Sequence, residues 1–249
     1  MARVVVVCLA TLVGAVGLGA EARAQDEARW AVGAGAAVFS SPFKGADDIV
    51  VPVPYFGYEG DRLSIGPFNG SYRTASTSGV TVSAITMLRF QLTDPEDSPF
   101  LEGMSKRRAT VEGGMAADLK AGPGAFRLEA QADLLGKHGG GQVSLGYGVG
   151  FPIGRLEVMS RAAVSWQSAE LVDYYYGVRA SEATAARPAY KAGDALVPSI
   201  GVDFSYPITR RTSLVAFTYA EFLPEAVTNS PIVSDKVAGQ IIIGAIHRF

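Results

Sequence analysis

Charged residues, histidine and cysteine are all scarce in this chain of 249 residues. Only 18 % of the residues are charged, where about 25 % is usual, and the formal net charge is −2. The chain therefore lacks the basic excess that a general nucleic-acid binder needs to neutralise phosphates. With 48 % hydrophobic residues it is also too apolar for a long disordered polymer.

Long apolar runs are equally rare, although the mean hydropathy is +0.20. The one long uncharged apolar run is 4–20, which excludes a polytopic helical membrane protein. Arg3 precedes the run, and Ala22-Arg23-Ala24 follows it as an A-x-A cleavage site. We expect residues 1–24 to be a signal peptide cleaved after Ala24, and residues 25–249 to form a single exported domain.

The single cysteine, Cys8, lies inside the expected signal peptide. The exported part then contains no cysteine, which excludes a disulfide-stapled secreted domain and argues against a structural zinc site. Export without disulfides favours a protein of the bacterial envelope. We expect the Gram-negative outer membrane.

What the chain does have is glycine, 29 in all, and a hydrophobic period of two. Phe126, Leu128 and Ala130 alternate with Arg127 and Glu129, as they would on the two faces of a strand. Eleven segments have this character, and even numbers are the bacterial rule, so we expect twelve strands, with ten as the alternative. A missed strand is most easily hidden in 94–108. The eleven segments are 30–40, 49–58, 62–68, 80–92, 111–119, 126–134, 144–151, 155–167, 199–206, 213–222 and 237–249.

These segments favour a transmembrane antiparallel β-barrel over a soluble β-sandwich. Many run to about ten residues, the length that spans a bilayer, where sandwich strands have about five or six. Tight turns that we assign to the periplasm alternate with longer loops that we assign to the outside. Aromatic residues stand at strand ends, as the girdles of such barrels require; they are Trp30, Tyr55, Tyr58, Phe90, Phe151, Trp166, Tyr206, Phe222 and Phe249.

The alternation places charged side chains of both signs in the lumen. Pairing Lys120 with Ala125 across the turn at 122–124 sets Asp118 opposite Arg127. Mixed signs predict a salt-bridged filling rather than the single-sign ring of a selective pore. The expected inward charges are Glu112, Asp118, Arg127, Glu129, Asp133, Arg155, Glu157, Arg161 and Asp203.

Catalytic motifs are weak. His138, in Lys137-His138-Gly139-Gly140-Gly141, superficially matches an esterase oxyanion loop, but the nucleophile motif G-x-S-x-G is missing. His138 could pair with a serine such as Ser144 in an enzyme, but nothing in the spacing favours this, and a glycine-rich hairpin loop is the preferred interpretation. We expect no catalytic residue, cofactor or metal. Asp47 and Asp48 beside Lys44, and Asp173 before three tyrosines (174–176), are interpreted as solvated loop residues rather than a cation or sugar site.

The order of short motifs resembles the MipA/OmpV family of outer-membrane proteins. The matching segments are 30–35 (WAVGAG), 45–48 (GADD), 51–54 (VPVP), 136–140 (GKHGG), 175–178 (YYGV), 188–190 (PAY), 229–233 (NSPIV) and 248–249 (RF). The resemblance implies a barrel that works as an interaction protein. Its name-giving member is similar to a scaffold that joins a murein-degrading lytic transglycosylase to a bifunctional murein synthase, and other members look like surface antigens or adhesins.

We therefore expect a non-enzymatic outer-membrane scaffold for peptidoglycan-remodelling enzymes. The alternatives are a small channel, a surface antigen or adhesin, and a lipid-modifying enzyme with His138 as base. Other expected partners are outer-membrane lipid with lipopolysaccharide, and the barrel assembly machinery through the terminal aromatic Phe249.

Overall fold

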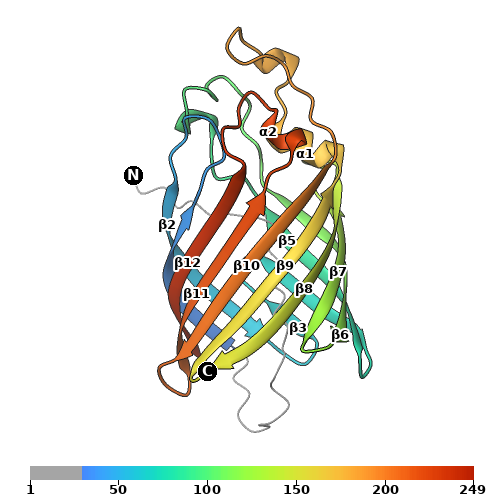
Figure 1. Ribbon diagram of the computed structural model, residues 1–249, viewed down its shortest axis with the longest axis vertical. Coiled ribbons are helices and arrows are strands. Elements are labelled where there is room, and N and C mark those ends of the chain that lie inside the picture. Colours follow the sequence, from blue (N-terminus) through green and yellow to red (C-terminus); the bar gives the residue numbers. More distant parts are fainter. Residues whose placement is uncertain (1–29) are drawn as a thin grey trace.

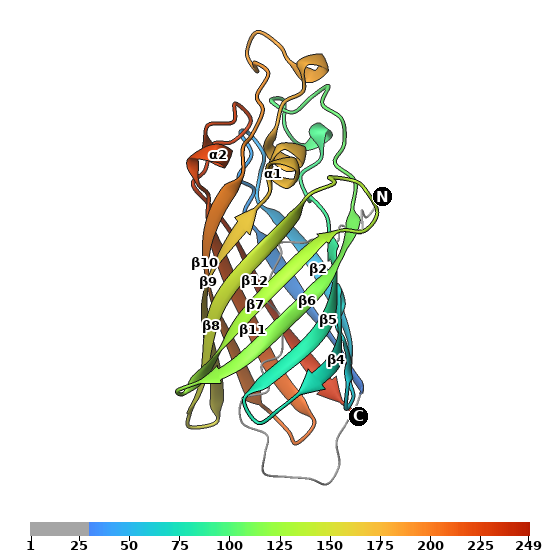
Figure 2. The same cartoon turned by 90° about the vertical axis from the view of Figure 1, so that its right-hand side faces the viewer.

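The computed structural model describes residues 30–249, which form a closed antiparallel barrel of twelve strands (Figures 1 and 2). The predicted fold class and strand number are thus confirmed. The first strand, β1 (Trp30–Phe39), closes the barrel against the last, β12 (Val237–Arg248). Between them come β2 (Ile49–Glu59), β3 (Leu63–Ile65), β4 (Asn69–Ser76), β5 (Val80–Arg89), β6 (Thr110–Ala121), β7 (Gly124–Asp133), β8 (Gly141–Ile153), β9 (Leu156–Gln167), β10 (Ala195–Pro207) and β11 (Thr212–Phe222).

The two ends of the barrel differ in their connections. At one end, which we call the turn end, the strands are joined by short segments at 60–62, 77–79, 122–123, 154–155 and 208–211. At the other, the loop end, lie the connections 40–48, 90–109, 134–140, 168–194 and 223–236. Two short helices, α1 (Ala169–Tyr176) and α2 (Glu225–Thr228), sit in the last two loops at the top of Figure 1. No helix within 30–249 has the length and apolar character of a membrane crossing.

The twelfth strand is not where the sequence suggested. Residues 94–108 are loop with a short 3₁₀ turn at Pro95–Asp97, whereas β4 was missed. The sequence of β4, NGSYRTAS, is mostly polar, and a register shift between Arg73 and Ala75 breaks its alternation. A bulge adds one residue to one side of the ladder, so the period of two that reveals a strand is lost there.

The predicted faces hold in β6 to β10, but Arg155, expected in the lumen, is exposed in the turn between β8 and β9, because the chain reverses there before the alternation of β9 begins. Met115 and Leu119 on β6 are exposed on the outer wall, whereas Glu112 on the same strand is fully buried in the lumen. The predicted pairing of Asp118 with Arg127 is present, with Arg127 Nη1 2.7 Å from Asp118 Oδ2 and Arg127 Nε 2.6 Å from Glu129 Oε1. Arg161 likewise bonds Asp203 at 2.7 Å. Opposite charges thus pair inside the barrel, away from the lipid-facing side chains.

Two of the expected girdle aromatics were misassigned. Trp30, Phe151, Trp166, Tyr206, Phe222 and Phe249 are indeed exposed at strand ends. Tyr55, however, shares the lumen-facing parity of Gly33, its partner on β1, and Phe90 is only 8 % exposed. Phe90 instead packs against Phe68, with ring centroids 5.8 Å apart. It follows β5 directly, where the wall of the barrel is incomplete.

Candidate functional site

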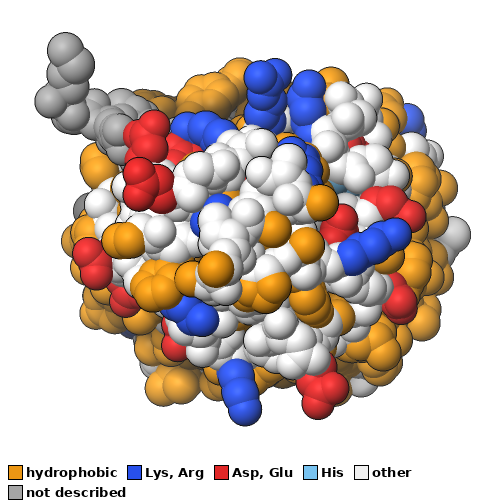
Figure 3. Space-filling view, turned by 90° about the horizontal axis from the view of Figure 1, so that it is seen from above, with side chains coloured by type: hydrophobic (Ala, Val, Ile, Leu, Met, Phe, Trp, Pro, Cys, Tyr) orange, Lys and Arg blue, Asp and Glu red, His pale blue; other side chains and the backbone are white. Residues whose placement is uncertain are grey.

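The loop end is covered by a folded cap with its own hydrophobic core. Phe43 in the first loop, Leu101 in 90–109, Val172 on α1 and Ile232 in the last loop are all at most 5 % exposed and belong to one cluster. Backbone bonds tie the same loops together: Lys44 N–H donates to the Ile232 carbonyl and Ser234 N–H to that of Pro42. Seen from the loop end, the mouth of the barrel is filled with side chains (Figure 3).

A buried ion pair joins loops 90–109 and 168–194. Arg107 Nη1 and Nη2 each lie 3.1 Å from one carboxylate oxygen of Glu182, and both side chains are at most 4 % exposed. Burial by itself raises the pKa of Glu182, but bonds from Arg107 and from the backbone N–H groups of Ser105 and Arg179 outweigh it and lower that pKa to about 2. The carboxylate is therefore ionised at every physiological pH.

A second buried arginine, Arg187, links the same two loops. Arg187 is 6 % exposed and donates to the carbonyl oxygens of Phe100, Glu102 and Glu182. A guanidinium has five donors in a rigid fork, and three carbonyls take up several of them here. Neither arginine was singled out from the sequence, because irregular loops have no period that marks a buried charge.

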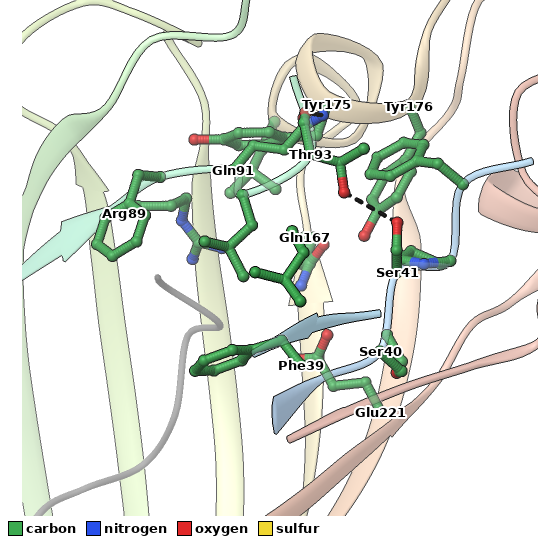
Figure 4. Close-up of a pocket in the computed structure, with 17 residues that line it drawn as sticks. Phe39, Ser40, Ser41, Arg89, Gln91, Thr93, Gln167, Tyr175, Tyr176 and Glu221 are labelled. Carbon is green, nitrogen blue, oxygen red and sulfur yellow. Dashed lines mark hydrogen bonds between the residues drawn. The ribbon is translucent and has the colours of Figure 1, made fainter. Parts of the chain in front are cut away.

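Beneath the cap lies a cavity of about 100 Å³ (Figure 4). Its wall is contributed by the loop-end parts of β1, β2, β5, β9, β11 and β12, by α1, and by the loops 40–48 and 90–109. Burial raises the pKa of Tyr176 on α1, and the Glu221 carboxylate raises it further, so the tyrosine hydroxyl stays protonated. The apolar lining residues include Phe39, Phe43, Ile49, Phe90, Leu92 and Leu171. The polar lining residues include Arg89, Gln91, Gln167, Tyr175, Tyr176 and Glu221.

A charged network lies between β5, β6 and the loop 134–140. Arg89 Nε is 2.8 Å from Glu112 Oε1, and Arg89 Nη2 donates to Gln142 at 2.6 Å. The same carboxylate oxygen of Glu112 is 3.1 Å from His138 Nε2. His138 Nδ1 accepts the Gly140 N–H at 3.0 Å, so the hydrogen of the neutral ring is on Nε2, which donates to Glu112.

These contacts bear on the hypothesis that His138 acts as a catalytic base. Both ring nitrogens of His138 are engaged in shaping loop 134–140, and the ring is buried. Ser144 instead bonds Ser165 on β9 at 2.7 Å. The structure does not bring His138 and Ser144 together. The other histidine of the described chain, His247, lies on the outer face, where its Nδ1 is 2.9 Å from Thr212 Oγ1.

Two of the acidic loop residues accept hydrogen bonds from backbone N–H groups of the loops. Asp173 Oδ1 accepts the Ala192 N–H at 2.8 Å, and Asp48 Oδ1 accepts the Ser41 N–H at 3.3 Å. Among residues 30–249, no group of three histidine, cysteine or acidic side chains is arranged to hold a metal ion.

The turn end carries an exposed basic surface. Arg155 reaches across to the Pro207 carbonyl at 2.6 Å and lies over the Tyr206 ring, which places it beside the β10–β11 turn with Arg210 and Arg211. Acidic residues are fewer here, namely Glu59, Asp61 and Glu157. We call the exposed cations of this end the basic turn surface; they are Arg62, Arg73, Lys120, Arg155, Arg210, Arg211 and Arg248.

Comparison with known proteins identifies the family of this barrel. The model of the family described as MltA-interacting protein MipA matches residues 32–249, almost all of the described barrel. The chain belongs to this family. It is 31 % identical to outer membrane protein Omp26La of Vibrio anguillarum over 88 % of this chain and 85 % of that one. It is 27 % identical to the MltA-interacting protein of Escherichia coli strain K12, over 91 % and 92 % of the two chains.

The chain is also similar to solved structures of other proteins. The translocator domain of the autotransporter NalP from Neisseria meningitidis is 8 % identical with a TM-score of 0.45, covering 91 % of this chain and 90 % of that one. The MipA-family relatives named above include outer-membrane proteins, and this chain is likewise an outer-membrane-type barrel.

Proposed function

We propose that this MipA-family barrel is a non-enzymatic scaffold that gathers peptidoglycan-remodelling enzymes at the outer membrane. The partners we propose are a lytic transglycosylase and a bifunctional murein synthase. The proposal rests chiefly on the family match, which spans residues 32–249. It includes a signal peptide of residues 1–24, cleaved after Ala24, and a mature domain of residues 25–249 in the Gram-negative outer membrane.

Charge at the turn end supports docking there. Periplasmic enzymes meet the barrel only on its periplasmic side, to which we assign the short turns. The basic turn surface would attract a partner with an acidic patch and speed its encounter. The opposite end, closed by the cap, and a lumen with paired charges such as Arg127 with Asp118 are features of a closed barrel rather than a wide channel.

A photocrosslinking experiment tests where the partners bind. A photoreactive residue is placed singly at Ser78 or Arg210, exposed at the turn end, and at Glu225 or Asp235, exposed in the cap. We expect adducts with murein hydrolases and synthases from the turn-end positions alone. Adducts confined to the cap positions, or the absence of any murein enzyme among turn-end adducts, would rule out this docking mode. Gly45 and Gly154 are poor sites because both have positive φ angles, which side chains rarely adopt.

Charge reversal tests the chemistry of the surface. Arg210→Glu combined with Arg211→Glu should weaken binding of the purified transglycosylase about tenfold at low salt, with a smaller effect at high salt where charges are screened. The control is Lys137→Glu with Lys236→Glu, an equal charge change on exposed loop-end residues. Equal loss of affinity in both double variants would contradict docking on the basic turn surface.

The other proposed partners are the barrel assembly machinery, membrane lipid and lipopolysaccharide, and the positions of exposed residues indicate where each would bind. Phe249 is exposed at the end of β12, beside the His247 ring at 4.9 Å, where we propose that the barrel assembly machinery recognises it. The exposed apolar side chains of the outer wall, such as Leu145 and Ile243, would contact membrane lipid, and lipopolysaccharide would surround the loop-end aromatics.

A further inference from the structure

The wall of the barrel has a gap between β2 and β5. β2 pairs with β1 along its whole length, from Trp30–Tyr58 to Phe39–Ile49. On its other edge only Tyr58 and Glu59 are paired, because β3 is three residues long. The β3–β4 connection turns back at 66–68, so within the described chain no ladder joins 49–57 of β2 to the loop-end part of β5.

Two prolines in β2 fit this unpaired edge. Pro52 and Pro54 lie opposite Ala36 and Ala34 within the ladder with β1. Alternate residues of a strand direct their N–H groups to the same neighbour, so the two missing donors fall on one edge. Proline is tolerated in strands where that edge has no partner. The V-P-V-P motif thus marks a strand with one open edge.

Side chains, not hydrogen bonds, fill the gap. Phe68 at the hairpin tip and Leu88 and Phe90 from the β5 side pack in one cluster with Val51 and Val53 of β2. The Phe68 carbonyl accepts the Leu88 N–H, which fixes the hairpin tip to β5 but not to β2. Rotamer changes of such side chains open a path far more readily than the rupture of a strand ladder does.

The cavity beneath the cap lies directly behind this cluster. Phe39, Ile49, Phe90 and Leu92 belong both to the apolar cluster and to the cavity wall. The cavity volume of about 100 Å³ is close to that of a dry engineered cavity, about 150 Å³, that binds benzene. A molecule of roughly one aromatic ring matches this space.

The polar groups in the cavity indicate which hydrogen-bonding group a bound molecule needs. Gln91 Oε1 is buried without a hydrogen-bond partner, although its Nε2 donates to the Thr93 carbonyl. Glu221, 7 % exposed, accepts a bond from Tyr219 at 2.8 Å and retains further acceptor capacity. Figure 4 shows Gln91, Gln167 and Glu221 around the same space. Because the unsatisfied atom Gln91 Oε1 is an acceptor, a ligand that donates a hydrogen bond is favoured over one that only accepts.

We propose that the cavity binds a small aromatic molecule with one hydroxyl donor, and that this molecule enters from the bilayer through the β2–β5 gap. The apolar ring packs against Phe39 and Phe90, and the hydroxyl donates to Gln91. The site is independent of the scaffold proposal, since it lies beneath the cap at the loop end and not at the turn end.

Ligand binding is measured in lipid nanodiscs by ¹⁹F NMR with 4-fluorophenol as probe. We expect saturable broadening of the probe signal, and little for fluorobenzene, which has no donor. Gln91→Leu should weaken 4-fluorophenol binding about tenfold, whereas Gln240→Leu, an inward glutamine outside this cavity, should not. Absence of saturation, or equal effects of the two substitutions, would refute the site.

The route is tested by closing the gap after folding. Val53→Cys with Phe68→Cys, in a Cys8→Ala background, is crosslinked with a short bis-maleimide across the gap. We expect exchange of 4-fluorophenol to slow at least tenfold relative to the same variant before crosslinking. The control pair is Ile200→Cys with Ala220→Cys, which are partners in the intact β10–β11 ladder. Unchanged exchange in the gap pair, or equal slowing in both pairs, would overturn entry through the gap.

Discussion

Single residues matter most where strands approach too closely for a side chain. A Cβ added to Gly114 on β6 would lie 1.9 Å from the carbonyl oxygen of Ala130 on β7, which neither backbone can accommodate. Gly114→Ala should therefore sharply reduce the folded yield, measured as the heat-modifiable band on gels. Gly79→Ala is the matched control, because nothing lies within 4 Å of the added atom. Equal yields from both variants would show that the β6–β7 ladder is looser than described.

The Arg107–Glu182 pair sets the stability of the cap. Glu182→Gln leaves Arg107 buried without its counter-charge, a change that typically costs about 3 kcal/mol. We expect amide exchange at Ser105, whose N–H donates to Glu182 at 2.9 Å, to accelerate about a hundredfold. Glu225→Gln, at an exposed position in the last loop, should leave this exchange unchanged.

The same carboxylate makes the cap sensitive to acid. Its pKa in the folded cap, about 2, is below the ordinary value of 4.5, so the ion pair stabilises the cap fully above pH 4.5. That stabilisation is lost as the pH falls from about 4.5 to about 2. Amide exchange in 101–108, corrected for intrinsic rates, should rise over this window in the native chain. In Glu182→Gln the rise should be much smaller, and an identical rise would assign the acid response to other groups.

At the scale of elements, β2 is distinguished by its open edge. Pro52→Val with Pro54→Val restores two N–H groups on an edge that has no partner, so we expect the free energy of unfolding to change by less than about 1 kcal/mol. Leu128→Pro places a proline in β7, which is paired on both sides, and should cost about 3 kcal/mol or more. Urea unfolding in detergent compares the two. Strong destabilisation by the valine pair would mean that the prolines do more than tolerate an open edge.

The strands differ in how plainly their sequences reveal them. β6 to β10 are regular, with one lipid-facing and one luminal face, and their faces and the Asp118–Arg127 register were predictable from alternation. β4 was not, since its bulge interrupts the period and its residues are polar. Phe90 was mistaken for a girdle residue because the sequence does not show that β3 ends after three residues.

At the scale of the whole molecule, the lumen of the barrel is blocked by the cap and by side chains. The cap fills the loop end, and Arg89, Arg127 and Arg161 are paired with carboxylates inside. We expect planar-bilayer recordings of the purified protein to show no discrete conductance steps at neutral pH, with a general porin as the positive control. Stable steps would indicate an open lumen and favour the channel alternative.

The sequence by itself determined the barrel and the inward placement of most charges, because a bilayer requires apolar residues at every second position of a long strand. The number twelve came from the rule of even strand numbers, and the place of β4 only from the structure. It did not determine the cap, the Arg107–Glu182 joint or the cavity around Gln91. These depend on loops distant in the chain meeting at one end, as when Ser41 comes to lie 2.9 Å from Thr93. Contacts of that kind follow from the closure of the barrel, which fixes where each loop begins and ends. Local patterns of residues in the sequence therefore do not predict them.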